Sequence, residues 1–169
     1  VQQARLTEVL DLGESLFHRW PDLAGPYGAD AASVLATAKL FGGDISGARA
    51  LALAALAHEQ DSLFASVTLR RALGHAARFE REHQAAAGWF AEAAQVGLAG
   101  GVPTLAIASL AYQAQDVAAL GRAEEAVALV RRAISEAGAL GSPLTELFAR
   151  TVEASLLSTG DGAERAAAA

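Results

Sequence analysis

Apolar residues recur along most of this chain at intervals of three and four positions, with polar residues between them. That spacing places the apolar side chains on one face of an α-helix, because the helix turns once in about 3.6 residues. Two neighbouring segments show it most clearly, with apolar positions at Ile107, Leu110, Ala114 and Val117 in one and at Ala123, Ala126, Val127, Val130 and Ile134 in the other. The pattern predicts a chain built from amphipathic helices.

Glycine and proline mark where these helices begin and end. They divide the chain into predicted helices at about 3–19, 30–41, 44–58, 62–78, 82–98, 103–119, 122–140 and 144–159. Asp44 is expected to cap the third of them, and Pro103 stands in the first turn of the sixth. The helices should form four antiparallel pairs, about 3–41, 44–78, 82–119 and 122–159, in an all-α fold.

A turn and the helix that follows it recur at a regular distance. Along the chain, Gly121 lies twice as far from Gly43 as it does from Gly160, and Glu82 occupies the position midway between the first two glycines. Five positions after Gly43, Glu82 and Gly121 stand small side chains of the kind that lets two helices approach closely, Ala48, Ala87 and Ala126. A repeat with a period of about 39 residues therefore organises the chain, and the alternative is coincidence in an alanine-rich bundle.

Two features indicate a fragment of a larger protein. The segment 161–169 after Gly160 looks like the first turns of a further helix, and the chain has no methionine and begins with Val1. Removal of an initiator before Val1 would also explain the start. We expect a single repeat domain over residues 1–169.

Composition narrows the class of protein. Hydrophobic residues make up 53% of the 169 residues, which is ample for a core. The net charge is −6, so direct binding to a nucleic-acid backbone is not expected, because such binding needs clustered Lys and Arg. There is no cysteine, so disulfides are excluded and cysteine usage leaves the compartment undetermined. No apolar stretch is long enough to cross a membrane, and the cytoplasm is the default expectation.

One segment resembles a known repeat. The string Gly121-Arg122-Ala123-Glu124-Glu125-Ala126-Val127, with Ala133 and Ile134 further on, resembles the turn and second helix of a tetratricopeptide repeat. The period here is about five residues longer than the usual 34. Leu110 replaces the early aromatic of the first helix, and only Pro103 and Pro143 represent the proline of that family. The longer period and the Ala/Gly/Arg-rich style resemble the degenerate repeats of large bacterial MalT-like, LuxR-type ATPase regulators.

The resemblance implies a right-handed superhelix in which one helix of each pair lines a concave groove. The lining helices would be 30–41, 62–78, 103–119 and 144–159. The polar residues on them that we expect to contact a ligand or partner are Arg71, His75, Arg78, Tyr112, Gln115 and Arg150. Arg71, His75 and Arg78 share a helix face and could hold a carboxylate or phosphate, although an ordinary solvated face has the same composition.

The sequence gives weaker indications of a metal site, an active site or a phosphate-binding site. The histidines have no metal-ligand spacing, Glu80, Glu82 and His83 crowd a single turn, and no nucleophile motif or phosphate-binding loop occurs. Trp89 and Phe90 are expected in the core between repeats rather than in a binding cage. We therefore expect neither catalysis nor a cofactor or metal.

The function favoured by these observations is a protein-interaction or regulatory module of a bacterial signalling or transcription-regulatory protein. Its groove would bind a protein or peptide partner, or neighbouring domains of the same chain, and a homodimer is one way to cover the last helix. The alternatives are a sensor that closes around a small ligand or peptide, and a helical enzyme whose cleft is invisible in the sequence.

Overall fold

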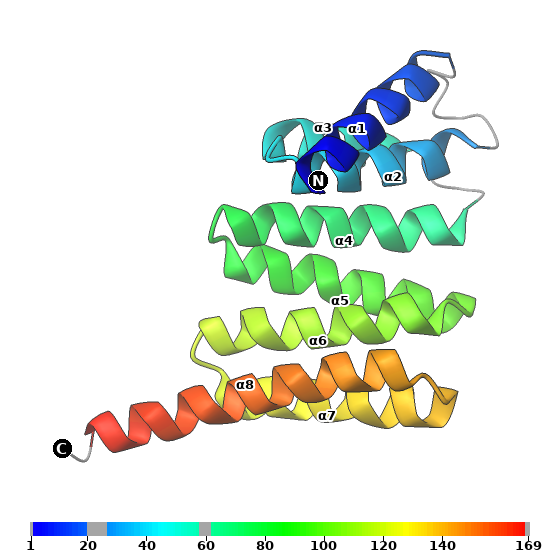
Figure 1. Cartoon of the computed structure of the whole chain (residues 1–169). Helices are drawn as coiled ribbons and strands as arrows, with labels where there is room; N and C mark the ends of the chain where they lie inside the picture. Colours follow the sequence, from blue (N-terminus) through cyan, green and yellow to red (C-terminus); the bar gives the residue numbers. More distant parts are fainter. Residues whose placement is uncertain (1, 20–26, 58–61, 168–169) are drawn as a thin grey trace. The chain divides into compact units, whose positions relative to one another are not determined.

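The computed structural model describes residues 2–19, 27–57 and 62–167, and every regular element in those ranges is an α-helix (Figure 1). The helices are α1 (Gln2–Arg19), α2 (Gly28–Phe41), α3 (Ile45–Leu56), α4 (Leu63–Phe79), α5 (His83–Gly100), α6 (Pro103–Ala119), α7 (Ala123–Leu140) and α8 (Pro143–Ala167). The predicted all-α class is confirmed. The first seven helices begin and end within two residues of the predicted positions.

The packing of the helices divides the chain into two units, Val1–Glu82 and His83–Ala169, and each is described by itself. In the first unit α2 packs against α1, α3 and α4, and α3 also packs against α4. In the second unit α6 packs against α5, α7 and α8, and α7 also packs against α8 (Figure 1). Within each unit, helices that follow one another through a short turn are therefore neighbours.

Alanine is the most frequent of the buried hydrophobic residues in the described part of the chain. In the second unit the core joins Ile107, Leu110 and Val117 of α6 to a row of alanines on α7, Ala126, Ala133 and Ala137. The three alanines that follow the predicted turns, Ala48, Ala87 and Ala126, are all buried. Small side chains at a contact allow two helix backbones to approach closely, so these positions hold the hairpins together. Ala123, by contrast, is exposed as the first residue of α7, so its predicted inward position is wrong.

The turns between helices share one backbone device. Residues in the left-handed region occur at Gly43, Arg81, Gly101, Gly121 and Gly141. The residue after each donates its backbone N–H to the carbonyl five positions earlier, as in Glu82 to Ala77 at 2.8 Å and Arg122 to Val117 at 3.2 Å. This closes the last turn of the preceding helix. The sequence suggested Glu82 as the counterpart of the turn glycines, but the structure gives that position to Arg81. The last four of these left-handed residues are equally spaced along the chain.

Replacing Arg81 with glycine is expected to stabilise the protein by about 1 kcal/mol. Arg81 has a φ of 62°, which is unfavourable for a side chain with a Cβ atom and free of strain for glycine. Chemical denaturation measures the difference. Gly121→Ala is the reciprocal control and should lose a similar amount, because a Cβ at Gly121 would meet no neighbouring atom and only its φ of 79° matters. Equal stability of Arg81→Gly and the wild type would contradict the expectation.

The C-terminal helix departs from the predicted pattern. A turn was expected at Gly160, with 161–169 starting a further helix, but α8 continues without interruption from Pro143 to Ala167. A glycine inside a helix costs about 1 kcal/mol relative to alanine. A turn at the same place would break several helical hydrogen bonds, and only packing of the following segment could compensate for the lost stability. Within the described residues, continuation of the helix is the outcome.

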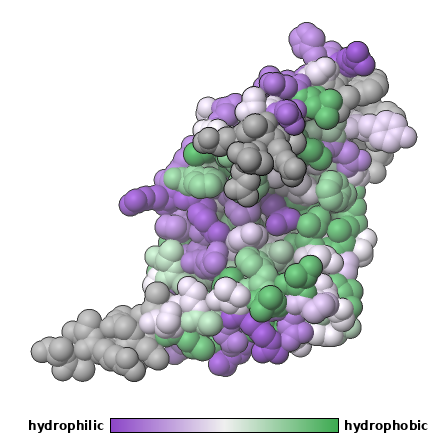
Figure 2. Space-filling view, viewed as in Figure 1, coloured by the Kyte–Doolittle hydropathy of each residue, from purple (hydrophilic) through white to green (hydrophobic). Residues whose placement is uncertain are grey.

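Several large apolar side chains remain on the surface. The most exposed are Tyr27, Phe41, Leu144 and Leu147. On the face seen in Figure 2, hydrophobic side chains lie among hydrophilic ones rather than under them. Within the described residues, no helix is long and apolar enough to cross a bilayer.

Candidate functional site

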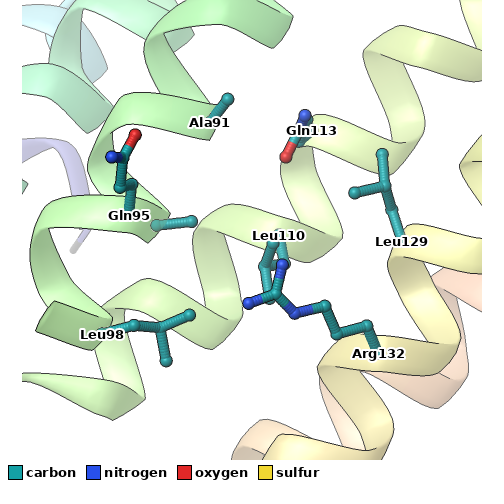
Figure 3. Close-up of a pocket in the computed structure, with 8 residues that line it drawn as sticks. Ala91, Gln95, Leu98, Leu110, Gln113, Leu129 and Arg132 are labelled. Carbon is teal, nitrogen blue, oxygen red and sulfur yellow. The ribbon is translucent and has the colours of Figure 1, made fainter.

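A hollow in the second unit lies over α6 and between α5 and α7. Its volume is about 400 Å³, and it is lined by Ala91, Ala94, Gln95 and Leu98 of α5, Leu110 and Gln113 of α6, and Leu129 and Arg132 of α7 (Figure 3). Among the described residues α6 packs against both α5 and α7, whereas α5 and α7 do not pack against each other. The hollow is the space that this arrangement leaves above α6.

The floor and the rim of this hollow differ in chemistry. Leu110 and Ala94 are buried at 3% and 2% exposure and form an apolar floor. Polar groups stand around it: the side chains of Gln95 and Gln113 carry amides, and Arg132 reaches in from α7 (Figure 3). Such a combination accepts an apolar side chain and orients it through a few polar contacts.

Arg132 is the only charged residue among the described residues that line the hollow. Its side chain is 56% exposed, and its Nε lies 3.9 Å from a carboxylate oxygen of Glu136, which is too far for a hydrogen bond. An i,i+4 ion pair of this kind is worth only a few tenths of a kcal/mol. The guanidinium can therefore turn to a carboxylate of a bound molecule at little cost.

The sequence did not predict this hollow. The expected groove lay on the helices now labelled α2, α4, α6 and α8, whereas two of the three walls here are α5 and α7. The signal was present in the spacing of Ala91, Ala94 and Leu98, which lie three and four positions apart on one face of α5. A helix face that is covered in the core has the same spacing. Among the described helices, this face of α5 lines a hollow because α5 and α7 do not pack against each other.

Three of the predicted groove residues lie on α4 in the first unit. Arg71, His75 and Arg78 share one face of that helix, as their spacing predicted, and all three are half-buried. Each has interaction partners, and the ring of His75 lies 6.4 Å from that of Phe41. The structure thus places them in packed surroundings, and ligand binding by them stays a prediction.

The other three predicted residues lie in the second unit. The ring of Tyr112 is stacked on Phe90 at 5.3 Å and meets Phe148 of α8 at 5.1 Å. Gln115 is half-buried one turn further along α6. Arg150 is exposed on α8, where it pairs with Glu146 at 2.7 Å. Tyr112 therefore joins three helices through its ring, and a role in binding for these residues stays a prediction.

The predicted core position of Phe90 is confirmed, because its side chain is fully buried. Its neighbour Trp89 is half-buried. Phe90 lies on α5 and Tyr112 on α6, so their stacked rings connect the two helices of the first hairpin in the second unit. Aromatic pairs of this geometry add to the energy of burial.

A charged residue is buried at the end of the same hairpin. Asp116 of α6 is 1% exposed, and its Oδ1 lies 2.9 Å from Nδ1 of His83, the first residue of α5. Glu80 and Glu82, close to His83 in the sequence, both pair with Arg49 of α3 instead. Within the described part of the chain, no three His, Cys, Asp or Glu side chains are grouped as metal ligands.

A smaller hollow of about 240 Å³ lies in the first unit beside an ion pair. Lys39 of α2 bridges Glu14 of α1 at 2.9 Å and Asp44, the predicted cap of α3, at 3.2 Å. Asp44 also accepts a hydrogen bond from the backbone N–H of Gly47 at 2.9 Å, which confirms it as the N-cap. This hydrogen bond, together with that from Lys39, holds the pKa of the Asp44 carboxyl below its ordinary value.

Acid is expected to destabilise the wild-type protein more than Asp44→Asn. Because the pKa of Asp44 is lowered in the folded state, its contribution is complete above about pH 4 and disappears as the pH falls through the lowered value. Asparagine caps the helix without a charge and so lacks this dependence. Urea denaturation at about pH 6 and about pH 2.5 measures the free energy of unfolding of both proteins. Equal losses on acidification would show that the charge of Asp44 contributes nothing.

Comparison with known proteins adds information on the fold alone. No protein family and no curated protein matches the chain. Among solved structures it is similar to that of BtubC (BKLC) from P. vanneervenii, with a TM-score of 0.61 and 18% sequence identity. The match covers 83% of this chain and 57% of that chain, so this chain spans little more than half of the length of BtubC. At this identity the likeness concerns the arrangement of the helices.

Proposed function

We propose that this protein is an interaction module that binds a segment of a partner protein in the hollow between α5 and α7. The observation that carries the proposal is the combination of an apolar floor with a loosely held guanidinium on a helical scaffold. A partner side chain such as leucine would bury apolar surface against Leu110 and Leu129. A carboxylate one turn away on the partner would meet Arg132.

The partner is therefore a helical or extended segment that carries an apolar residue close to an acidic one. Gln95 and Gln113 can hydrogen-bond polar groups beside the apolar side chain, which would fix its orientation. The contact is small, so a peptide alone is expected to bind weakly and a larger partner to add contacts outside the hollow.

Substitutions in the hollow test this proposal. Peptides selected from a displayed library against the wild-type protein should lose about tenfold or more in affinity for Leu129→Glu, and should lose affinity for Arg132→Glu. Arg122→Glu is the matched control, because Arg122 is similarly exposed and pairs with Glu125 in the first turn of α7. Selected peptides that are indifferent to both Leu129→Glu and Arg132→Glu would contradict binding in the hollow.

A small-ligand sensor is the second candidate, and the volume of the hollow supports it. A space of about 400 Å³ lies in the range of small-molecule sites. A metabolite that binds the native state should raise the melting temperature of the wild type and leave that of Leu129→Glu unchanged. If no compound does so while selected peptides bind, the interaction module is the better description.

We also propose that the helix hairpins of this chain are stacked in a right-handed, tetratricopeptide-like superhelix. The supporting observations are the equal spacing of the turns at Arg81, Gly101, Gly121 and Gly141 and the resemblance of the segment that begins at Gly121. On the same resemblance, the parent function would be bacterial signalling or transcription regulation in the cytoplasm. Small-angle scattering from the full chain tests the shape, because a superhelix has a larger radius of gyration than a compact bundle of equal length.

A further inference from the structure

The exposed face of α8 has a counterpart elsewhere in the chain. Helices α6 and α8 both begin with proline, at Pro103 and Pro143, and each proline follows a left-handed glycine two positions earlier. The two helices can therefore be aligned on their prolines. This register pairs Ile107 with Leu147, Ala111 with Thr151, Ala114 with Ala154 and Val117 with Leu157.

Three of the four pairs are apolar on both helices, and all four pairs have opposite burial. On α6 the four residues are buried at no more than 1% exposure, and they lie on faces that α5, α7 and α8 cover. On α8 all four are exposed, with Leu147 at 62% and Leu157 at 47%. Leu144, at the beginning of the same face, is 81% exposed. The stripe thus presents apolar surface of the kind that is buried on α6.

The α7 helix shows what fits such a face. Its residues Ala126, Val130, Ala133 and Ala137 share one core cluster with α6 and α8, and its first turn has the sequence Ala-Glu-Glu-Ala at 123–126. The distance along the chain from Pro103 to Pro143 also separates this turn from a similar sequence, Ala-Glu-Arg-Ala at 163–166. That sequence directly follows Gly160-Asp161-Gly162. The chain therefore repeats the first turn of α7 at the end of α8, where the backbone continues as uninterrupted helix.

We propose that the exposed stripe of α8, formed by Leu144, Leu147, Thr151, Ala154 and Leu157, is an interaction surface for one antiparallel amphipathic helix of the α7 type. Such a helix carries small side chains on the face that meets α8, so its backbone can approach closely. The occupant is thus defined by chemistry: alanines and a valine at helical spacing, with Glu near its N-terminus. This surface is separate from the hollow between α5 and α7.

Charged side chains of both signs lie beside the stripe. Arg150 and Glu146 flank it as an ion pair, and Glu153 on another side of α8 is held by Arg131 at 3.1 Å. An α7-type helix brings two adjacent arginines, the counterparts of Arg131 and Arg132, and two glutamates at its first turn. Opposite charges are therefore available on both helices, while the stripe supplies the apolar contact.

The experiment uses a free peptide with the sequence of residues 121–141, labelled with a fluorophore, and the full chain. Fluorescence anisotropy should show saturable binding, and Leu147→Lys should weaken it about tenfold or more. Leu53→Lys is the matched control, because Leu53 is 48% exposed on α3 in the other unit and should leave the affinity unchanged. A scrambled peptide of the same composition should not bind.

Two results would overturn the proposal. One is the absence of saturable binding, or binding that Leu147→Lys does not weaken. The other is self-association of the chain, seen by analytical ultracentrifugation and abolished by Leu147→Lys, because a second copy would then occupy the stripe. Circular dichroism of Leu147→Lys should show unchanged helix content, since the substituted side chain is exposed. Failure of this test leaves binding in the hollow between α5 and α7 unaffected.

Discussion

Phe90→Ala is expected to lower the free energy of unfolding by about 3–5 kcal/mol, the largest loss expected from truncation of one side chain in this protein. Phe90 is fully buried and is among the largest side chains in the core, and its ring stacks on Tyr112 at 5.3 Å. Truncation removes that contact and leaves a cavity, because the neighbouring helices are held at their spacing by alanines that cannot extend to fill it. Chemical denaturation followed by circular dichroism measures the loss.

The same substitution at an exposed phenylalanine is the control. Phe79, at the end of α4, is 56% exposed, so Phe79→Ala should change stability by no more than about 0.5 kcal/mol. Phe90→Leu should fall between the two, since leucine fills part of the volume. A loss below about 1 kcal/mol for Phe90→Ala would mean that the second unit repacks freely around α5.

Removal of the partner of a buried carboxylate is also expected to destabilise the protein. His83→Ala should cost about 1–3 kcal/mol, because the hydrogen bond of 2.9 Å to Asp116 is lost while that carboxylate stays buried. His83→Gln keeps an N–H donor of similar reach and should lose less. Urea denaturation of the three proteins at neutral pH measures the differences.

A double-mutant cycle separates this contact from other effects of the substitution. His83→Ala combined with Asp116→Ala should show a coupling energy of about 1 kcal/mol or more, because the two side chains are in direct contact. Gln84→Ala is the control, since Gln84 is exposed on the next position of α5. Additive losses in the cycle would show that His83 stabilises the helix end independently of Asp116.

Helix positions followed from the sequence to within two residues for all the described helices except α8, and the reason is local. Glycine, proline and capping residues act through the backbone of their own turn, as the hydrogen bond from Gly47 to Asp44 shows. Arg81 is the exception among the turns, because nothing in its side chain indicates a left-handed residue. Its conformation is imposed by the hydrogen bond from Glu82 to Ala77 that closes α4.

The candidate site depended on information that no single helix carries. Arg71, His75 and Arg78 share a face as predicted, yet their half-burial comes from surroundings that helical periodicity does not describe. Gln95, Gln113 and Arg132 have no feature that distinguishes them from other polar residues on exposed helix faces. They become a rim only because α6 separates α5 from α7 and leaves a hollow between them.

The sequence by itself determined the helical class, most helix boundaries and the apolar face of each helix, since these depend on backbone preferences and on spacing within one helix. The tertiary structure alone decided which faces are covered. Ile107 and Leu147 have equivalent positions and similar side chains, yet one is buried and the other exposed. Burial depends on which helices are neighbours, and that is the property from which both the hollow and the open face of α8 arise.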